Sequence, residues 1–171
     1  MTLTSSEREA VRKAVAEHPG AALEDIARRQ GCTTADVLTC LPEGEAVLVP
    51  GSLFARVWEA ITGWGEITFI VNTGDVIVEV KADLPEGSEA RGYFNLHGKP
   101  LGGHIRASEC DRIAFVSRKL FASDTKSVQF YGKAGDCMFK IYLGRDENRQ
   151  MRPEQIRAFE ELCAELATLS A

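Results

Sequence analysis

Histidine is scarce in this sequence, and clusters of metal-binding side chains are missing from it. The 171 residues include three histidines and five cysteines. The cysteines are widely spaced and odd in number, and no C-x-x-C motif occurs. A structural zinc site needs Cys and His ligands grouped in the sequence, so this class of metal site is excluded. We expect reduced thiols in a cytoplasmic protein, most of them packed as small apolar side chains.

Long apolar runs and an excess of positive charge are missing as well. No segment offers the roughly 18 apolar residues that a transmembrane helix needs. The N-terminal residues lack the basic and apolar segments of a secretory signal. We therefore expect no membrane insertion and a cytoplasmic location. Lys and Arg number 20 against 25 Asp and Glu, and the net charge of −5 disfavours general binding to polyanions such as nucleic acid.

The length and the order of periodic segments predict one domain of the α+β class. About 150 residues is the usual domain size, so residues 1–171 are expected to form a single domain. Residues 1–65 are expected to be mainly helical, residues 66–144 mainly antiparallel strands, and residues 152–170 a C-terminal helix. The predicted architecture is a single large antiparallel sheet with N-terminal helices and a C-terminal helix.

Capping residues and glycines divide the N-terminal region into four short helices. Ser5–Glu7 offers caps for the first helix, Gly31 closes the second, and Thr33 or Thr34 caps the third. Ser52 is the expected cap of the fourth helix. The helices are expected over about residues 5–17, 21–30, 34–41 and 53–62.

Two hairpins stand out in the strand region. Ile67–Val71 and Val76–Val80 flank the polar segment Asn72–Asp75, and a second hairpin joins Ser127–Tyr131 to Cys137–Leu143. Further strands are expected around residues 92–96, 104–107 and 112–117. The alternation in the last hairpin predicts two faces, with Cys137, Phe139, Ile141 and Leu143 on one and Met138, Lys140 and Tyr142 on the other.

Residues 23–38 have the spacing of a helix-turn-helix. Ala27, Gly31 and Val37 lie where that motif has a small residue, a turn glycine and an apolar residue. The second helix of a DNA reader carries polar and basic side chains that reach bases and phosphates. The second helix here has no Lys or Arg and contains Asp36. A helical hairpin packed on the sheet is the favoured interpretation, and a DNA-binding regulator is a distant alternative.

A glycine-rich loop precedes one of the histidines. Gly102 and Gly103 stand directly before His104. Glycines allow a flat ligand to approach the backbone, and imidazole is an axial ligand of haem iron. Taken alone, this arrangement is more typical of a turn or a strand end. His97 is also expected at a strand end and His18 at a helix terminus, and no catalytic G-x-S-x-G or H-E-x-x-H motif occurs.

Several longer strings resemble one known family. They are Arg91–Leu96, Gly103–Ile105, Phe139–Asp146 and Gln150. On these strings, and nearly end to end, the sequence resembles the cytosolic haem-utilisation carrier family of Gram-negative bacteria, HutX/ChuX. The resemblance implies a haem-binding protein whose fold is like one half of the two-repeat haem-degrading and haem-trafficking proteins. It also implies a homodimer, which would protect the edges of a large open sheet.

The resemblance also carries candidate binding residues onto this chain. His104 matches the histidine of the family's G-H-I string and is the candidate iron ligand. Some relatives have a histidine where Asn72 stands, which leaves the second ligand open between water, a partner-subunit residue and His97. The residues expected beside the haem or paired with its propionates are Gly102, Gly103, Lys99, Arg106 and Arg91.

Three functions follow from these observations. The preferred one is an intracellular haem carrier in haem uptake and iron utilisation, with haem as cargo and no catalytic residues. The alternative is a haem-degrading enzyme or its partner subunit, and the distant alternative is the DNA-binding regulator. For the carrier, the expected partners are a second copy of the chain and a haem-degrading or haem-trafficking protein, with no nucleic acid.

Overall fold

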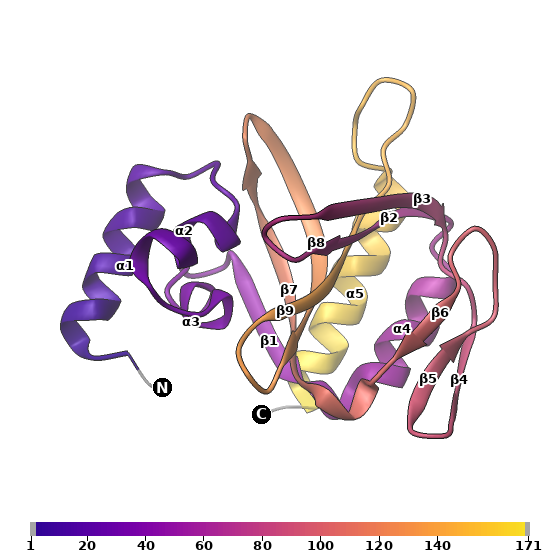
Figure 1. Cartoon of the computed structure of the whole chain (residues 1–171). Coiled ribbons are helices and arrows are strands. Elements are labelled where there is room, and N and C mark those ends of the chain that lie inside the picture. Colours follow the sequence, from indigo (N-terminus) through magenta and orange to yellow (C-terminus); the bar gives the residue numbers. More distant parts are fainter. Residues whose placement is uncertain (1–2, 170–171) are drawn as a thin grey trace.

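The computed structural model describes residues 3–169, with helices at both ends of the chain and strands between them (Figure 1). The helices are α1 (Ser5–Glu17), α2 (Leu23–Gln30), α3 (Thr34–Leu38), α4 (Phe54–Thr62) and α5 (Pro153–Leu169). The strands are β1 (Ala46–Pro50), β2 (Glu66–Asn72), β3 (Ile77–Asp83), β4 (Gly87–Ala90), β5 (Tyr93–Leu96), β6 (Gly103–Ile105), β7 (Cys110–Leu120), β8 (Ser123–Gly132) and β9 (Cys137–Tyr142). Two short 3-10 turns, η1 (Gly51–Leu53) and η2 (Ala107–Glu109), complete the order. The α+β class is confirmed.

Two of the N-terminal helices begin at capping boxes. Thr4 caps α1, because its side chain accepts a bond from the Glu7 amide and its own amide donates to the Glu7 carboxylate at 2.7 Å. Thr33 caps α3 in the same way, as predicted. The prediction of Ser52 as a cap is wrong, since it lies inside η1 and α4 begins without a side-chain cap. The third helix also ends at Leu38, earlier than expected.

The prediction of a mainly helical region over residues 1–65 misses one strand. β1 pairs antiparallel with β7, from Ala46 opposite Val116 to Pro50 opposite Arg112. β1 is an edge strand of its sheet, the place where a strand tolerates proline. The apolar run is too short for its periodicity to distinguish a strand from a helix.

The strands form two sheets rather than the predicted single one. The large sheet has six strands in the order β1-β7-β8-β9-β2-β3, and a small sheet has the order β4-β5-β6. The chain leaves the large sheet at Leu84, which is buried, and at Pro85, which has no N–H to extend β3. The indole N–H of Trp58 donates to the Pro85 carbonyl at 2.8 Å and holds this exit in place. The residues of β4 have no apolar alternation, so the sequence gives no signal for the extra sheet.

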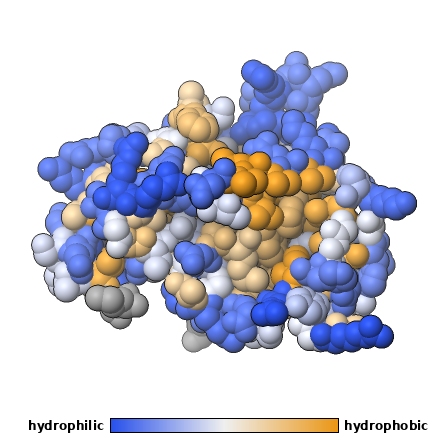
Figure 2. Space-filling model, viewed as in Figure 1, coloured by the Kyte–Doolittle hydropathy of each residue, from blue (hydrophilic) through white to orange (hydrophobic). Residues whose placement is uncertain are grey.

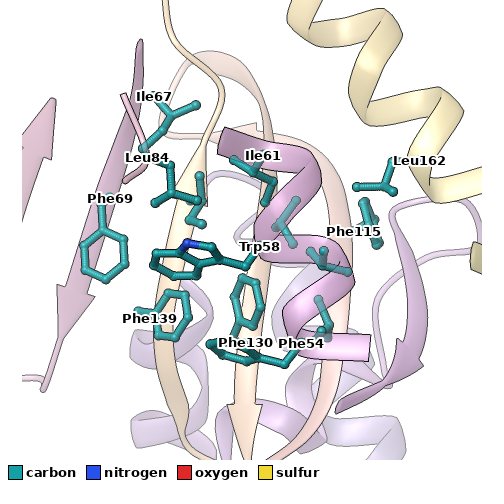
Figure 3. Packing of buried hydrophobic residues seen from close by; sticks show 14 of the residues in the cluster. Phe54, Trp58, Ile61, Ile67, Phe69, Leu84, Phe115, Phe130, Phe139 and Leu162 are labelled. Atoms are coloured by element: carbon teal, nitrogen blue, oxygen red, sulfur yellow. The ribbon is translucent and has the colours of Figure 1, made fainter. Parts of the chain in front are cut away.

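Each face of the large sheet is covered by different elements. One face carries α4 and α5 over an aromatic core (Figure 3), and the small sheet packs against the same core. There Phe130 and Phe139 stack with ring centroids 4.3 Å apart, and Phe54 meets both of them edge-on. The other face carries α1, α2 and α3, which pack on β7 and β8 at the opposite side of the molecule (Figure 1).

A β-bulge changes which side chains of β9 face each core. Phe130 pairs with Phe139, but the next residue, Tyr131, pairs with Cys137, so that Met138 is an extra residue in β9. The predicted faces are therefore wrong for two positions. Met138 packs with Phe139 against the aromatic core, whereas Cys137 packs with Tyr131 under the N-terminal helices. A bulge reverses the alternation at the inserted residue, which strict period-two reasoning cannot anticipate.

The C-terminal helix is anchored by a buried amide. Pro153 begins α5, close to the predicted start, and Ser170, the last residue of the predicted helix, lies outside the described residues. Gln155 accepts a bond from the Gly144 amide at 2.6 Å and donates to the carbonyls of Trp64 and Glu66. Within residues 3–169, no helix combines the length and the apolar character needed to cross a membrane.

Candidate functional site

A cavity of about 400 Å³ lies between the large sheet and the small sheet. This volume is within the usual range for small-molecule sites. The large sheet supplies apolar walls through Phe69, Val71, Met138 and Phe139, and the small sheet and its loop supply Leu96, Leu101, Gly102, Gly103, His104, Ile105 and Arg106. The cavity is thus an apolar slot with two polar side chains at one side.

His104 is the better positioned of these polar side chains. It lies in β6 opposite Asn95 of β5, and its Nδ1 atom is 2.6 Å from the Asn95 side-chain oxygen. The Asn95 amide nitrogen donates to the carbonyls of Ser88, Ala90 and Tyr93, so its oxygen is the atom left to face the imidazole. An oxygen acceptor requires the proton on Nδ1, which leaves the Nε2 lone pair available to a metal.

This contact is the outer-shell arrangement that metal-binding histidines use. A ligating imidazole almost always donates its second N–H to a carbonyl or carboxylate, which fixes its tautomer and orientation. The His104 side chain is exposed at the cavity edge, so an incoming ligand can reach it. The arrangement fits the coordination of an iron atom carried by a flat apolar ligand.

Arg106 supplies a positive charge next to His104. Its guanidinium lies over the Tyr93 ring, 5.4 Å from the centroid, and donates to the Tyr93 hydroxyl at 3.2 and 3.3 Å. A guanidinium stays protonated in proteins, and the hydrogen bond to Tyr93 raises the pKa of Arg106 further. The Tyr93 and His104 rings lie in an edge-to-face arrangement with their centroids 6.0 Å apart. The cavity therefore places an imidazole that could bind a metal next to a guanidinium that could bind an anionic group.

The structure brings four of the predicted site residues together and separates the others. Gly102, Gly103, His104 and Arg106 line the same cavity. His97 lies at the end of β5, as predicted, but its Nε2 atom bonds the Ser88 hydroxyl at 2.7 Å outside that cavity. The side chains of Lys99, in the β5–β6 loop, and Arg91, in the β4–β5 turn, also do not line it.

Asn72 lines a neighbouring cavity of about 450 Å³ between β2, β9 and the helix α2. Its side-chain oxygen accepts a bond from the Gly74 amide at 2.9 Å within the β2–β3 turn. The two cavities share Val71 and Met138 in their walls. Asn72 is therefore separated from His104 by these two side chains.

Several site residues could not be found from local motifs. Asn95 and Tyr93 position His104 and Arg106 through pairing across the small sheet. Met138 reaches the cavity only through the bulge in β9. Alternating residues of one strand, Asn95 and Tyr93, are the one signal that could have pointed to a shared face.

The helix-turn-helix spacing belongs to a packed pair of helices. In α3, Thr34, Ala35, Val37 and Leu38 are buried. A recognition helix needs exposed side chains that reach base edges. The buried face of α3 favours the helical hairpin over the DNA-binding alternative.

Comparison with known proteins identifies the relatives of this chain. Residues 47–162 match the sequence profile of the family described as haem utilisation ChuX/HutX. The intracellular heme transport protein HutX of Vibrio cholerae is 36% identical over 139 residues, which are 80% of this chain and 72% of that protein. The confirmed resemblance thus extends over most of the chain.

Solved structures agree with this assignment. A protein from Erwinia carotovora is 43% identical with a TM-score of 0.88, covering 96% of this chain and 99% of that one. A structure of the heme-binding protein ChuX is 40% identical with a TM-score of 0.83, covering 91% and 98% of the two chains.

More distant structures share the fold alone. PhuS of Pseudomonas aeruginosa is 14% identical with a TM-score of 0.74, and the match covers 94% of this chain but 48% of PhuS. The ChuS protein of Escherichia coli O157:H7 is 12% identical, with 49% of its length covered. The likeness to one half of longer proteins is confirmed. Together, the profile match, the identities and the fold place this chain in the ChuX/HutX family of haem-utilisation proteins.

Proposed function

We propose that this chain binds haem in the cavity between the two sheets and carries it within the cell, with His104 as an iron ligand. The observation that carries the proposal is the bond between His104 Nδ1 and Asn95 Oδ1 at 2.6 Å beside an apolar cavity. It holds the imidazole with Nε2 available to iron. Names of the relatives support the carrier role, since one is a heme transport protein and another a heme-binding protein.

The walls of the cavity are suited to the two parts of a haem. Phe69, Val71 and Phe139 offer an apolar surface to the porphyrin plane. Arg106 at the edge would pair with a propionate, because a guanidinium and a carboxylate form strong charge-assisted hydrogen bonds. Bound haem would supply the absorption and the iron chemistry, while the protein binds and orients it.

The position of the site is compatible with release of the cargo. His104 and Arg106 are exposed, and Gly102 and Gly103 beside them have no side chains to cover the edge. A carrier must exchange its ligand with donor and acceptor proteins. An accessible edge leaves a haem within reach of a haem-degrading or haem-trafficking partner.

We also propose that two copies of the chain associate through the edge strand β3. Val76, Ile77 and Val78 are between 51% and 60% exposed, and they form an apolar patch over β3 (Figure 2). β3 has a neighbour on one side only, so its other side offers unpaired backbone groups. Two associated copies would match the doubled length of proteins that contain this fold twice.

A haem titration tests the proposed site. We expect purified wild-type protein to give a saturable shift of the Soret band, and we expect His104→Ala to lose it. His97→Ala is the matched control, because His97 is an exposed histidine of the same small sheet outside the cavity, and it should bind like wild type. Binding that survives in His104→Ala but is lost in His97→Ala would overturn the assignment.

The complex of the wild-type protein with haem also distinguishes a carrier from a haem-degrading enzyme. With a reductant and oxygen present, a carrier keeps its haem absorbance. Loss of that absorbance with release of a tetrapyrrole product would instead support a haem-degrading function. A variant without His104 provides the background rate for haem in solution.

A further inference from the structure

Asn72 is not placed to bind the iron of a haem held in the cavity of His104. Its amide oxygen already accepts the Gly74 amide, and its side chain lines the neighbouring cavity rather than that of His104. Amides are also not among the usual protein ligands of haem iron, which are imidazole, thioether, thiolate and phenolate. Another side chain of the His104 cavity must therefore be considered.

Within residues 3–169, the cavity of His104 offers one further side chain of the right chemistry. Apart from His104 itself, its lining consists of Phe, Val, Leu, Ile, Gly, Arg106 and Met138. Hydrocarbon side chains have no donor atom, and a guanidinium stays protonated and cannot ligate. The Met138 thioether is a known type of haem ligand, paired with histidine in cytochromes c. On this ground, and resting on the proposed haem function, we propose that Met138 is the second axial ligand opposite His104.

The bulge in β9 is the device that places Met138 there. Regular pairing would turn residue 138 toward the N-terminal helices and Cys137 toward the cavity of His104. The insertion between the Phe130–Phe139 and Tyr131–Cys137 pairs reverses these two positions. Bulges beside functional sites commonly serve to re-aim one side chain. The local backbone thus presents a thioether, and not a thiol, to the cavity.

The surroundings of Met138 fit a ligand that can adjust its position. Met138 lies in the wall between the two cavities, beside Val71, and has open volume on both sides. An unbranched side chain with three rotatable bonds can move its sulfur within such a space. A flexible thioether opposite an anchored imidazole would hold iron firmly on one side and exchangeably on the other.

Spectroscopy of the haem complex tests this ligand without any assay of activity. In ferric wild type we expect a six-coordinate, low-spin spectrum with the far-red charge-transfer band of iron–thioether bonding. Met138→Leu should lose that band, show high-spin iron and a lower reduction potential, and keep haem through His104. Met151→Leu is the matched control, because Met151 lines a different cavity, and it should leave the spectrum unchanged.

A second variant keeps the test decisive if Met138→Leu folds poorly. Met138→His should give the low-spin spectrum of two imidazole ligands, which requires that residue 138 reaches the iron. A Met138→Leu spectrum identical to wild type, or a Met138→His spectrum without a second imidazole, would overturn the proposal. If His104→Ala loses haem binding but Met138→Leu keeps the wild-type spectrum, the proposed haem function is retained and Met138 is excluded as a ligand. If the wild-type protein binds no haem, both the proposed haem function and the proposed Met138 ligand are refuted.

Discussion

At the scale of single residues, the site depends on Asn95 as much as on His104. Asn95 ties the imidazole to β5 and uses its amide nitrogen to bond three backbone carbonyls. These carbonyl bonds fix which way the amide points, and the amide in turn fixes the tautomer of the imidazole. The Asn95 side chain therefore determines how the His104 imidazole is oriented.

Replacing Asn95 should weaken haem binding. We expect Asn95→Ala to lower haem affinity about 10- to 100-fold, the usual effect of removing an outer-shell partner of a metal ligand. The measurement is a haem titration, with circular dichroism to verify the fold. Asn72→Ala is the matched control, because its amide bonds Gly74 and not the imidazole. Equal losses in the two variants would argue against the positioning role of Asn95.

The buried thiols give a prediction about pH. Burial raises the pKa of Cys110 from 9.0 to about 11 and that of Cys137 to about 12. The folded state therefore keeps protons that the unfolded state releases, and the resulting stability is present below pH 9 and lost as the pH rises through these values. We expect the free energy of unfolding to fall between about pH 9 and pH 12.

Labelling with a thiol reagent at pH 9 checks this prediction. Cys110 and Cys137 should react far more slowly in the folded protein than after unfolding in urea. Mass spectrometry of the digested protein assigns the label to each cysteine. Equal labelling rates of these two thiols in folded and unfolded protein would contradict the raised pKa values.

At the scale of elements, a buried ion pair attaches α2 to the large sheet. The Lys140 ammonium lies 2.6 Å from the Glu24 carboxylate, and the two side chains are 7% and 10% exposed. Removing one partner of such a pair leaves a buried unpaired charge, whereas replacing both partners by apolar residues is often tolerated. This pair, together with the apolar contacts of the N-terminal helices, fixes the position of α2 on β9.

The ion pair can be tested by a double-mutant cycle. We expect Lys140→Met to lower the free energy of unfolding by about 3–5 kcal/mol, because Glu24 stays buried without a counter-charge. The double variant Lys140→Met/Glu24→Leu should recover a large part of that loss. Urea unfolding followed by circular dichroism gives both values. A double variant that is less stable than Lys140→Met would be inconsistent with the ion-pair argument.

The elements also show where sequence reasoning succeeds and where it fails. The two hairpins and some helix ends were predictable, because turn residues and capping boxes act within a few positions, as at Thr33 and Gly31. The caps expected at Ser5–Glu7 and Ser52 were wrong, since Thr4 caps α1 and α4 has no side-chain cap. β1 and β4 were not, because short strands become recognisable only through the strands they pair with. The bulge at Met138 could not be predicted for the same reason, because only the register of β9 against β8 defines it.

Some residues of the candidate site were also predictable from the sequence, and others were not. His104, Gly102, Gly103 and Arg106 are neighbours in sequence, and the structure places all four on one cavity. Lys99 lies five residues before His104, in the same β5–β6 loop as Gly102, but its side chain does not line the cavity. The opposite wall comes from β2 and β9, and local sequence carries no information about which distant strands face His104.

At the scale of the whole molecule, the apolar edge of β3 should control the oligomeric state. We expect Ile77→Lys to shift the proposed dimer to monomer, because it places a charge in the centre of the patch. Phe121→Lys is the matched control, since Phe121 is 81% exposed at the turn between β7 and β8. Analytical ultracentrifugation over a range of concentrations measures both. A monomeric wild type, or an unchanged dimer in Ile77→Lys, would refute association through β3.

The elements that cover the large sheet leave a cavity beside His104. The N-terminal helices cover one end of the large sheet, and α4 and α5 cover the aromatic core behind the other (Figure 1). The small sheet leans against the same core but leaves a cavity where β5 and β6 meet β2 and β9. The fold thus leaves an apolar space beside one anchored imidazole.

Chemical rescue tests the central claim, that the His104 imidazole at this cavity holds the iron of haem. In a haem titration, His104→Gly should lack the saturable Soret shift of wild type, and added imidazole should restore it by occupying the vacated position. Imidazole should leave the wild-type titration largely unchanged. Haem binding by His104→Gly with wild-type affinity and spectrum, without imidazole, would contradict the account.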